Sequence, residues 1–237
     1  ARKNMDLRLF DIAPVFFPKA LPVTELANEK LMVAGLITGR RSPIAWDTDN
    51  AQVDFYDMKG ILERFLTTIG VQKYTVERGE HFAMHPGKTA LLKKGRDVIA
   101  TLGEIHPTVA ANFGIAQSVY VFEMEVDTLL RYRKKKNTIA SLPKYPASTR
   151  DLAILVDAEL STAEIERVIA KKGGKFFRGT TLFDVYMGKQ VGSGKKSMAF
   201  HLHFQSDDKT LTDEEVDAAF ADILAAAQSQ LHAELRA

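Results

Sequence analysis

The stretch "LFDVYMGKQVGSGKKSMAFHLHF", residues 182–204, decides the fold of the second half of this chain. Its three glycines and three lysines suggest a phosphate-binding loop, which needs Gly, four residues and then Gly-Lys-Ser/Thr between a strand and a helix. Here Gly194-Lys195 is followed by Lys196, and residues 197–205 alternate between apolar and polar side chains, as a strand does. The stretch therefore predicts a β-hairpin whose glycines permit turns with positive φ.

The three lysines of this hairpin, Lys189, Lys195 and Lys196, are expected at a mobile tip. Two roles fit lysines in such a place. They either keep the tip soluble or contact the phosphate backbone of an RNA. The sequence leaves both roles open.

The segments around the hairpin supply the other elements of a small domain. Residues 150–156, "RDLAILV", alternate as a strand, and "AELR" near the end of the chain is a short strand candidate. Two capping boxes, Ser161 with Glu164 and Thr212 with Glu215, mark the starts of two helices. The order strand, helix, strand, strand, helix, strand predicts a ferredoxin-like βαββαβ domain whose two helices cover one face of the sheet.

Alternation along the strands predicts which side chains face these helices and which lie on the open face. The helix side is expected to hold Phe183, Val185, Met198, Phe200, Leu202 and Phe204. The open face is expected to hold Ala153, Asp184, Tyr186, Ser197, Ala199, His201 and His203. Small, polar and aromatic groups on an exposed sheet are typical of a platform for single-stranded bases.

The positive charge of the chain is concentrated in one short segment. Residues 1–130 carry 15 Lys and Arg against 16 Asp and Glu, and residues 143–237 carry 12 against 14. Residues 131–142, "RYRKKKNTIASL", carry five bases and no acid. This run lies just before "PKYP", where two prolines interrupt regular structure. It is either a solvated linker or a contact for a polyanion.

Composition excludes several classes of protein. The chain has no cysteine, which excludes disulfides and cysteine-based zinc sites and fits a cytoplasmic location. It has no apolar run long enough to span a membrane and no signal peptide at its start, so no membrane partner is expected. Since the first residue is Ala and a strand pattern begins almost at once, we expect a piece of a longer polypeptide.

Three segments resemble the ferredoxin-fold anticodon-binding domain that closes the bacterial phenylalanyl-tRNA synthetase beta subunit: "YPASTRDLAILVD", the hairpin stretch and "LTDEEVDAA". The first half is similar to the catalytic-like core of that subunit in "LRLFDIAPVFFP", "DFYDMKGILERFL", "HPGKTALL" and "LGEIHPTVA". The resemblance implies an α+β chain. Residues 1–130 would form a non-catalytic class II synthetase-like domain with an antiparallel sheet, 131–142 a basic linker and 143–237 the anticodon-binding domain.

The resemblance also implies that the core has lost the catalytic groups of class II synthetases. Their second motif carries an arginine that clamps an ATP phosphate, and "FDIAPVFFPK" places Phe17 there and Lys19 at the following glutamate. Their third motif has two glycines and an adenine-stacking arginine, and "FEMEVDT" places Glu123, Glu125 and Thr128 at those positions. Two carboxylates repel a triphosphate, so we expect no catalytic residue and no bound cofactor in this chain.

The family further implies four residues for recognition of the first anticodon base, a guanine: Ala153, Asp184, Tyr186 and Ser197. Backbone contacts to RNA are expected from Lys189, Lys195 and Lys196 in the hairpin and from Lys134, Lys135 and Lys136 in the basic run. The partners implied are tRNA-Phe and a catalytic alpha subunit, in a tetramer of two alpha and two beta chains. The complete enzyme would use ATP and Mg²⁺.

Two further patterns have structural explanations. An apolar stripe on residues 58–70 holds Met58, Ile61, Leu62, Phe65 and Ile69, which favours core packing over an intersubunit seam. His81 and His85 are four residues apart and His106 lies downstream, but Pro86 and Gly87 follow at once, so no helix carries the pair and no metal site is expected.

The resemblance therefore implies a tRNA-binding, non-catalytic part of phenylalanine–tRNA ligase, which is inactive alone and supports a catalytic partner. An alternative is a free-standing RNA-binding module without a synthetase partner. An independent nucleotide-dependent enzyme is disfavoured by Phe17 and Thr128.

Overall fold

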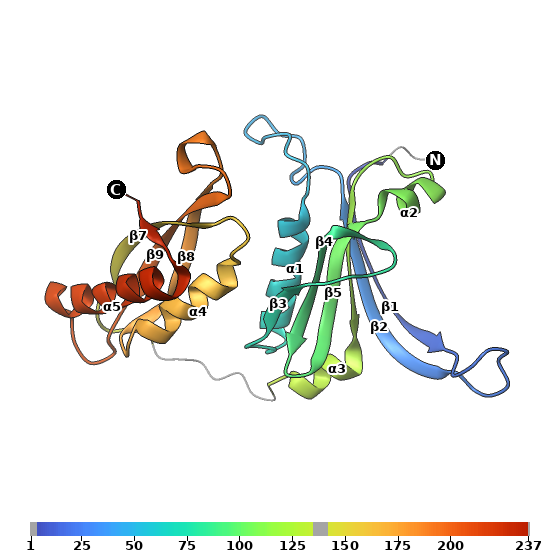
Figure 1. The fold of residues 1–237 in the computed structure, drawn as a ribbon. Coiled ribbons are helices and arrows are strands. Elements are labelled where there is room, and N and C mark those ends of the chain that lie inside the picture. Colours follow the sequence, from blue (N-terminus) through green and yellow to red (C-terminus); the bar gives the residue numbers. More distant parts are fainter. Residues whose placement is uncertain (1–3, 135–141, 237) are drawn as a thin grey trace. The chain divides into compact units, whose positions relative to one another are not determined.

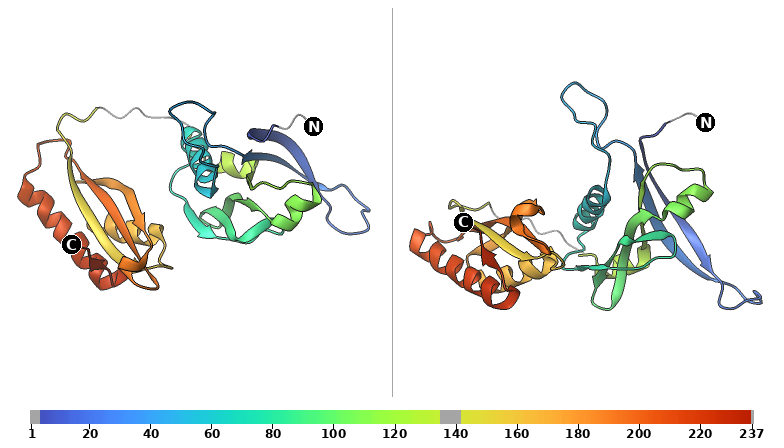
Figure 2. Two further views of the ribbon diagram at one scale, coloured as in Figure 1. Left: turned by 90° about the horizontal axis from the view of Figure 1, so that it is seen from above. Right: turned by 45° about the horizontal axis from the view of Figure 1, so that its top comes forward.

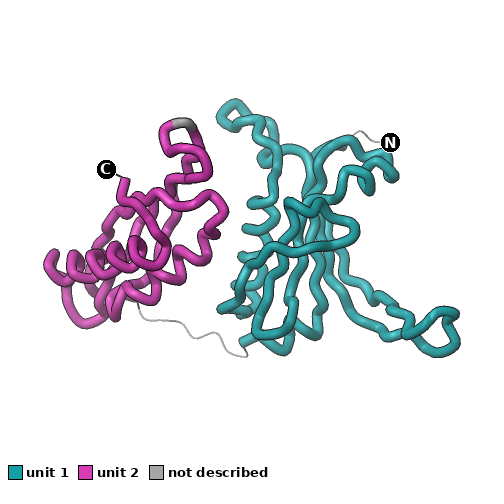
Figure 3. Tube along the Cα trace, in the orientation of Figure 1, with its two compact units in different colours: residues 1–138 teal, residues 139–237 magenta. Residues whose placement is uncertain are grey.

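The computed structural model describes residues 4–134 and 142–236 of the 237-residue chain, apart from the side chain of Lys189. The chain divides into two compact units, residues 1–138 and 139–237, and each is described by itself (Figure 3). Both units are α+β and their sheets are antiparallel throughout, so the predicted fold class is confirmed.

The first unit is built on a six-stranded sheet with the order β1-β2-β6-β5-β4-β3 (Figure 1). Its strands are β1 Leu7–Phe17, β2 Asn28–Thr38, β3 Thr75–Arg78, β4 Met84–Lys94, β5 Asp97–Ile105 and β6 Val119–Glu125. The eleven-residue strands β1 and β2 pair along their whole length. Strand β1 is an edge strand, and β2 pairs on its other side with β6.

Three helices accompany this sheet: α1 Phe55–Thr68, α2 Pro107–Asn112 and α3 Val126–Tyr132. Helix α1 starts with a capping box, in which Asp54 accepts from the Asp57 amide and the Asp57 side chain accepts from the Asp54 amide. The apolar stripe of α1 is only partly buried in the core. Met58 and Leu62 are 1% and 0% exposed, whereas Ile61 and Phe65 keep 43% and 38% of their surface exposed.

The basic run begins inside the first unit. Arg131 is part of α3 and pairs with Asp97 at 3.2 Å, and Lys134 donates to the side-chain oxygen of Gln72 at 2.8 Å. Lys135 and Lys136 lie outside the described residues.

The second unit has the predicted βαββαβ order (Figure 2). Its strands are β7 Ser148–Asp157, β8 Phe177–Tyr186, β9 Lys195–Phe204 and β10 Glu234–Leu235, in the sheet order β10-β7-β9-β8. Its long helices are α4 Thr162–Lys172 and α5 Asp213–Leu231, and a short 3₁₀ turn η1 covers Lys189–Val191. Both predicted capping boxes are present, with Ser161 and Thr212 as N-caps.

The core of the second unit lies between the helices and one sheet face. Leu152, Ile154, Phe200 and Leu202 on the strands are fully buried, as are helix residues such as Ile165. Burying large aliphatic and aromatic side chains contributes about 1.5–3 kcal/mol each, so this seam fixes the register of β7 and β9.

One parity prediction was wrong. The pairing passes from Leu182↔Phe200 to Asp184↔Ala199, so Phe183 is an extra residue in β8, a β-bulge. Its ring stacks on the His201 ring, with centroids 4.1 Å apart, and therefore lies on the helix-free face rather than against the helices. Val185 pairs with Met198 as expected but is 48% exposed, because β8 is an edge strand.

Candidate nucleic-acid interface

The helix-free face of the second sheet brings together the four residues predicted to recognise a base. Ala153 lies opposite Ala199, which in turn lies opposite Asp184. Ser197 lies opposite Tyr186 in the next row of the ladder. Directly opposite residues share a face of the sheet, so these side chains lie on one surface formed by β7, β9 and β8.

Small side chains form the middle of this surface, and a carboxylate and an aromatic ring lie at its β8 side. Ser197 and Ala199 are only 2% and 9% exposed. Asp184 is exposed, and among the described side chains its carboxylate has no hydrogen-bond or ion-pair partner. Tyr186 is half-buried. An unengaged carboxylate beside an aromatic ring can accept hydrogen bonds from a base that stacks on the ring.

Arg236, which was not predicted from the sequence, contacts three of these four residues. Its guanidinium Nη1 donates to Ser197 Oγ at 2.9 Å, and its Cζ lies 5.7 Å from the centroid of the Tyr186 ring. Its backbone amide donates to the Ala153 carbonyl at 3.0 Å. The signal was available: parity along the predicted strand "AELR" places this arginine on a defined face of the sheet.

The glycine-rich loop positions Tyr186. The predicted hairpin is confirmed, with Gly192 and Gly194 at φ +82° and +78° before β9 begins. The backbone of Gly188 is extended, a conformation that any residue adopts, so the glycine matters here because it has no side chain. A Cβ atom there would lie 2.6 Å from Cζ of Tyr186.

The prediction of lysines on a mobile tip was wrong for two of the three. Lys195 and Lys196 are the first residues of β9, because the ladder with β7 extends that far. Lys195 pairs with Glu234. Lys196 Nζ donates to the carbonyls of Ala158 and Leu160 at 3.0 and 2.5 Å. Lys189 lies in η1, and its contact with RNA stays a prediction.

The two histidines of β9 extend the same face and are engaged locally. His201 Nδ1 lies 2.7 Å from Asp151 Oδ1, and His203 Nε2 lies 2.9 Å from the hydroxyl of Thr181. No group of three potential metal-ligating side chains occurs within residues 4–134 and 142–236. In the first unit, His81 instead lies 3.3 Å from the Glu123 carboxylate.

In the first unit, three of the residues that the sequence resemblance predicts to replace class II catalytic groups surround one small cavity. Phe17, Glu123 and Glu125 line it, and its volume is about 150 Å³. Lys30 also lines it, but this cation pairs with Glu125 at 3.1 Å. Pockets that bind small molecules and cofactors usually have volumes of about 300–1,000 Å³. A cavity that is small and lined by carboxylates does not fit ATP.

Thr128, which the sequence resemblance predicts to replace the adenine-stacking arginine, is 3% exposed. Its hydroxyl donates to Glu125 at 3.1 Å and accepts from Arg131 at 2.9 Å. This side chain is therefore a buried link between β6 and α3, with no surface for a base to stack on.

No helix in the described part of the chain is long and apolar enough to cross a membrane.

The chain resembles known proteins along its whole length. The family profile described as "Phenylalanyl tRNA synthetase beta chain CLM domain" matches residues 1–126, and "Ferredoxin-fold anticodon binding domain" matches residues 143–236. Phenylalanine–tRNA ligase beta subunits from Syntrophotalea carbinolica and Clostridium acetobutylicum are 39% and 40% identical over all of this chain. The chain spans only 29% and 28% of the length of these two relatives.

Among solved structures, a pyrrolysyl-tRNA synthetase from Desulfitobacterium hafniense matches with a TM-score of 0.39 and 15% identity, covering 54% of this chain and 41% of that one. This likeness is too weak to support a conclusion. The family matches and the full-length similarity confirm the resemblance found in the sequence: the chain belongs to the phenylalanyl-tRNA synthetase beta chain family and carries its anticodon-binding domain.

Proposed function

We propose that this chain is a tRNA-binding, non-catalytic part of phenylalanine–tRNA ligase. Its second unit recognises the anticodon of tRNA-Phe, and its first unit supports the catalytic alpha subunit. One observation carries the RNA role: Asp184, Tyr186, Ser197 and Ala153 lie together on the helix-free face of a domain that matches an anticodon-binding family.

The chemistry of this face suits guanine. The N1–H and the exocyclic amine of guanine are adjacent donors, and one carboxylate such as Asp184 accepts both. Adenine, cytosine and uracil do not present that pair. Tyr186 supplies a ring on which the base stacks, and the small side chains of Ala153 and Ala199 leave room beside it.

The proposed function leaves the chemical step to the alpha subunit, which would use ATP and Mg²⁺. The carboxylates around the 150 Å³ cavity and the engaged Thr128 support this division. The chain without alpha subunit is expected to show no phenylalanine-dependent ATP–pyrophosphate exchange. Robust exchange by a pure preparation would contradict it.

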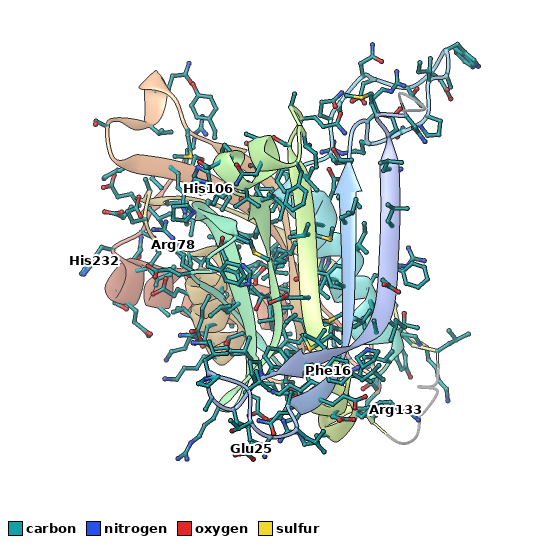
Figure 4. The ribbon with its side chains drawn as sticks, turned by 90° about the vertical axis from the view of Figure 1, so that its right-hand side faces the viewer. Phe16, Glu25, Arg78, His106, Arg133 and His232 are labelled. Carbon is teal, nitrogen blue, oxygen red and sulfur yellow. The ribbon has the colours of Figure 1, made fainter. Side chains whose placement is uncertain are left out.

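Exposed apolar surface supports the scaffolding role. On edge strand β1, Leu9, Phe10, Ile12 and Phe16 are 55–78% exposed. A groove of about 590 Å³ lies between this strand and helices α1 and α3, lined by Phe10, Ile61 and Phe65 among others. Figure 4 shows Phe16 near the end of β1 and Arg133 just past α3. Large exposed apolar patches and open strand edges mark surfaces for protein partners.

The proposed occupant of this groove is the alpha subunit, in a tetramer of two alpha and two beta chains in the cytoplasm. Phe10→Asp should abolish copurification of a coexpressed alpha subunit, because it puts a charge into an apolar contact. Phe113→Asp is the matched control, since Phe113 is 77% exposed against 78% for Phe10 and does not line the groove. If wild type captures no alpha subunit, a free-standing RNA-binding module becomes the better description.

Titration of the chain with tRNA-Phe, and with the same tRNA carrying another first anticodon base, tests the RNA role.

A further inference from the structure

A cation and a carboxylate stand at opposite ends of one row across the second sheet. The pairing of β10 with β7 runs Glu234↔Leu155 and Leu235↔Ile154, and the Arg236 amide bonds the Ala153 carbonyl as the next step. Ala153 then pairs with Ala199, and Ala199 with Asp184. The row therefore reads Arg236, Ala153, Ala199, Asp184 on the helix-free face.

The two alanines make a low floor between the charged ends. Neighbouring strands lie about 4.8 Å apart, so the backbones of Arg236 and Asp184 are separated by roughly 14 Å. A purine with a hydrogen-bonded group on each side fits such a span, because the arginine side chain is long and the aspartate is short. Tyr186 borders this floor in the neighbouring row, opposite Ser197.

The Arg236 guanidinium is held in one orientation but keeps free hydrogen-bond donors within the described residues. Of its five N–H donors, Nη1 binds Ser197 Oγ, and no other side-chain donor of Arg236 has a partner within the described residues. The Tyr186 ring limits its movement on one side, with the Cζ atom 5.7 Å from the ring centroid. A planar fork held in this way can still donate two parallel hydrogen bonds.

Guanine offers an edge that such a fork recognises. Its O6 and N7 atoms are adjacent acceptors, and arginine binds that pair in a bidentate manner. Adenine presents an amino group in place of O6 and would oppose the guanidinium. The O6/N7 edge is next to the N1–H and amine edge assigned to Asp184, so both residues can bind one base at once.

We propose that Arg236 is a second specificity-determining residue, which binds the O6/N7 edge of the guanine whose donor edge Asp184 accepts. The inference rests on the proposed anticodon recognition. A guanidinium then binds the acceptor edge of guanine and the Asp184 carboxylate binds its donor edge, so that guanine is recognised on two edges. Ser197 then acts as a positioning residue, since its hydroxyl holds the guanidinium above the floor.

The test uses anticodon stem-loops of tRNA-Phe with guanine, 7-deazaguanine or hypoxanthine as the first anticodon base. The 7-deaza base lacks only the N7 acceptor, and hypoxanthine lacks only the exocyclic amine. Dissociation constants are measured for the whole chain, Arg236→Met and Asp184→Asn. Arg236→Met keeps an apolar stem of similar length without donors. Arg167→Met on the exposed surface of α4 is the matched control for loss of one positive charge.

Wild type and Arg167→Met should bind the 7-deaza stem-loop roughly 5-fold or more weakly than the guanine stem-loop. Arg236→Met should bind both with the same affinity, while still losing affinity for hypoxanthine. Asp184→Asn should show the reverse pattern. Ratios are compared within each variant, so a general loss of electrostatic attraction cancels.

Two results would overturn the inference in distinguishable ways. If wild type prefers guanine over the other natural bases but Arg236→Met keeps the wild-type penalty for 7-deazaguanine, Arg236 does not read the N7 edge and the proposed function stands. If wild type shows no preference for guanine at all, the proposed anticodon recognition fails and the role of Arg236 fails with it.

Discussion

The backbone of Gly188 passes directly against the phenol of Tyr186, leaving no room for a side chain on the glycine. A Cβ atom at residue 188 would lie 2.6 Å from Cζ of the ring, well inside contact distance. The φ of Gly188 is −165°, an extended conformation that any residue adopts. The requirement for glycine is therefore steric, and it links the loop to the ring on which we propose a base stacks.

Gly188→Ala should displace the Tyr186 ring and weaken tRNA-Phe binding, with little change in thermal stability because both residues are near the surface. Isothermal titration and a melting curve on the same preparation check this. Gly60→Ala in α1 is the control, since nothing lies within 4 Å of a Cβ there. Wild-type affinity in Gly188→Ala would show that the ring position does not matter for binding.

Tyr186→Ala should weaken tRNA-Phe binding roughly 5- to 150-fold, since stacking of a base on an aromatic ring contributes about 1–3 kcal/mol. Tyr186→Phe keeps the ring and should bind within about 3-fold of wild type on the same grounds. Filter binding at constant salt measures both. An alanine variant as tight as its phenylalanine counterpart would remove the ring from the interface.

The basic run should add affinity that depends on salt and not on RNA sequence. Each phosphate neutralised on a single strand contributes roughly 0.7 to the slope of log K against log salt. Replacing Arg131, Arg133, Lys134, Lys135 and Lys136 by Gln should therefore flatten the slope by at most about 3.5 units. A smaller change is expected, because Arg131 already pairs with Asp97 and Lys134 with Gln72. An unchanged slope would identify the run as a solvated linker.

The first unit should lose stability in acid through Glu104, which is 7% exposed. Burial would raise the pKa of this carboxyl, but hydrogen bonds from Lys88 and Ser118 outweigh it and hold the pKa below its usual range. A depressed folded pKa contributes stability above the unfolded value, about 4.3, and loses it as pH falls through the folded value. Denaturant unfolding between pH 7 and pH 3 should show a smaller acid-induced loss for Glu104→Gln than for wild type. Parallel curves would exclude this carboxyl as a source of the pH dependence.

The second unit could be predicted from the sequence because local signals agree there. Capping boxes at Ser161 and Thr212 and alternation along residues 150–156 each specify one element, and the buried faces of these elements then fit together. The bulge at Phe183 could not be foreseen, because a single extra residue in an edge strand leaves the hydrophobic pattern of its neighbours intact.

The charged residues of the site were harder to predict than its core. Lys196 donates hydrogen bonds to two backbone carbonyls of the β7–α4 turn. These partners come together only in the folded domain, so the sequence pattern does not reveal them. Arg236 was overlooked because its two-residue strand, β10, carries little pattern, although its parity was readable. Asp184 and Tyr186 were placed correctly because the bulge precedes both of them in β8.

The most direct test of anticodon recognition is the affinity of this chain for tRNA-Phe compared with the same tRNA carrying adenine as its first anticodon base. Wild type should bind the natural tRNA more tightly by roughly 5- to 150-fold, the range for loss of one well-formed base contact. Asp184→Asn should lose the part of that preference that the carboxylate supplies, since its amide nitrogen opposes a donor edge, whereas Asp222→Asn on the exposed surface of α5 should keep the whole preference. Equal affinity of wild type for the two tRNAs would contradict the account.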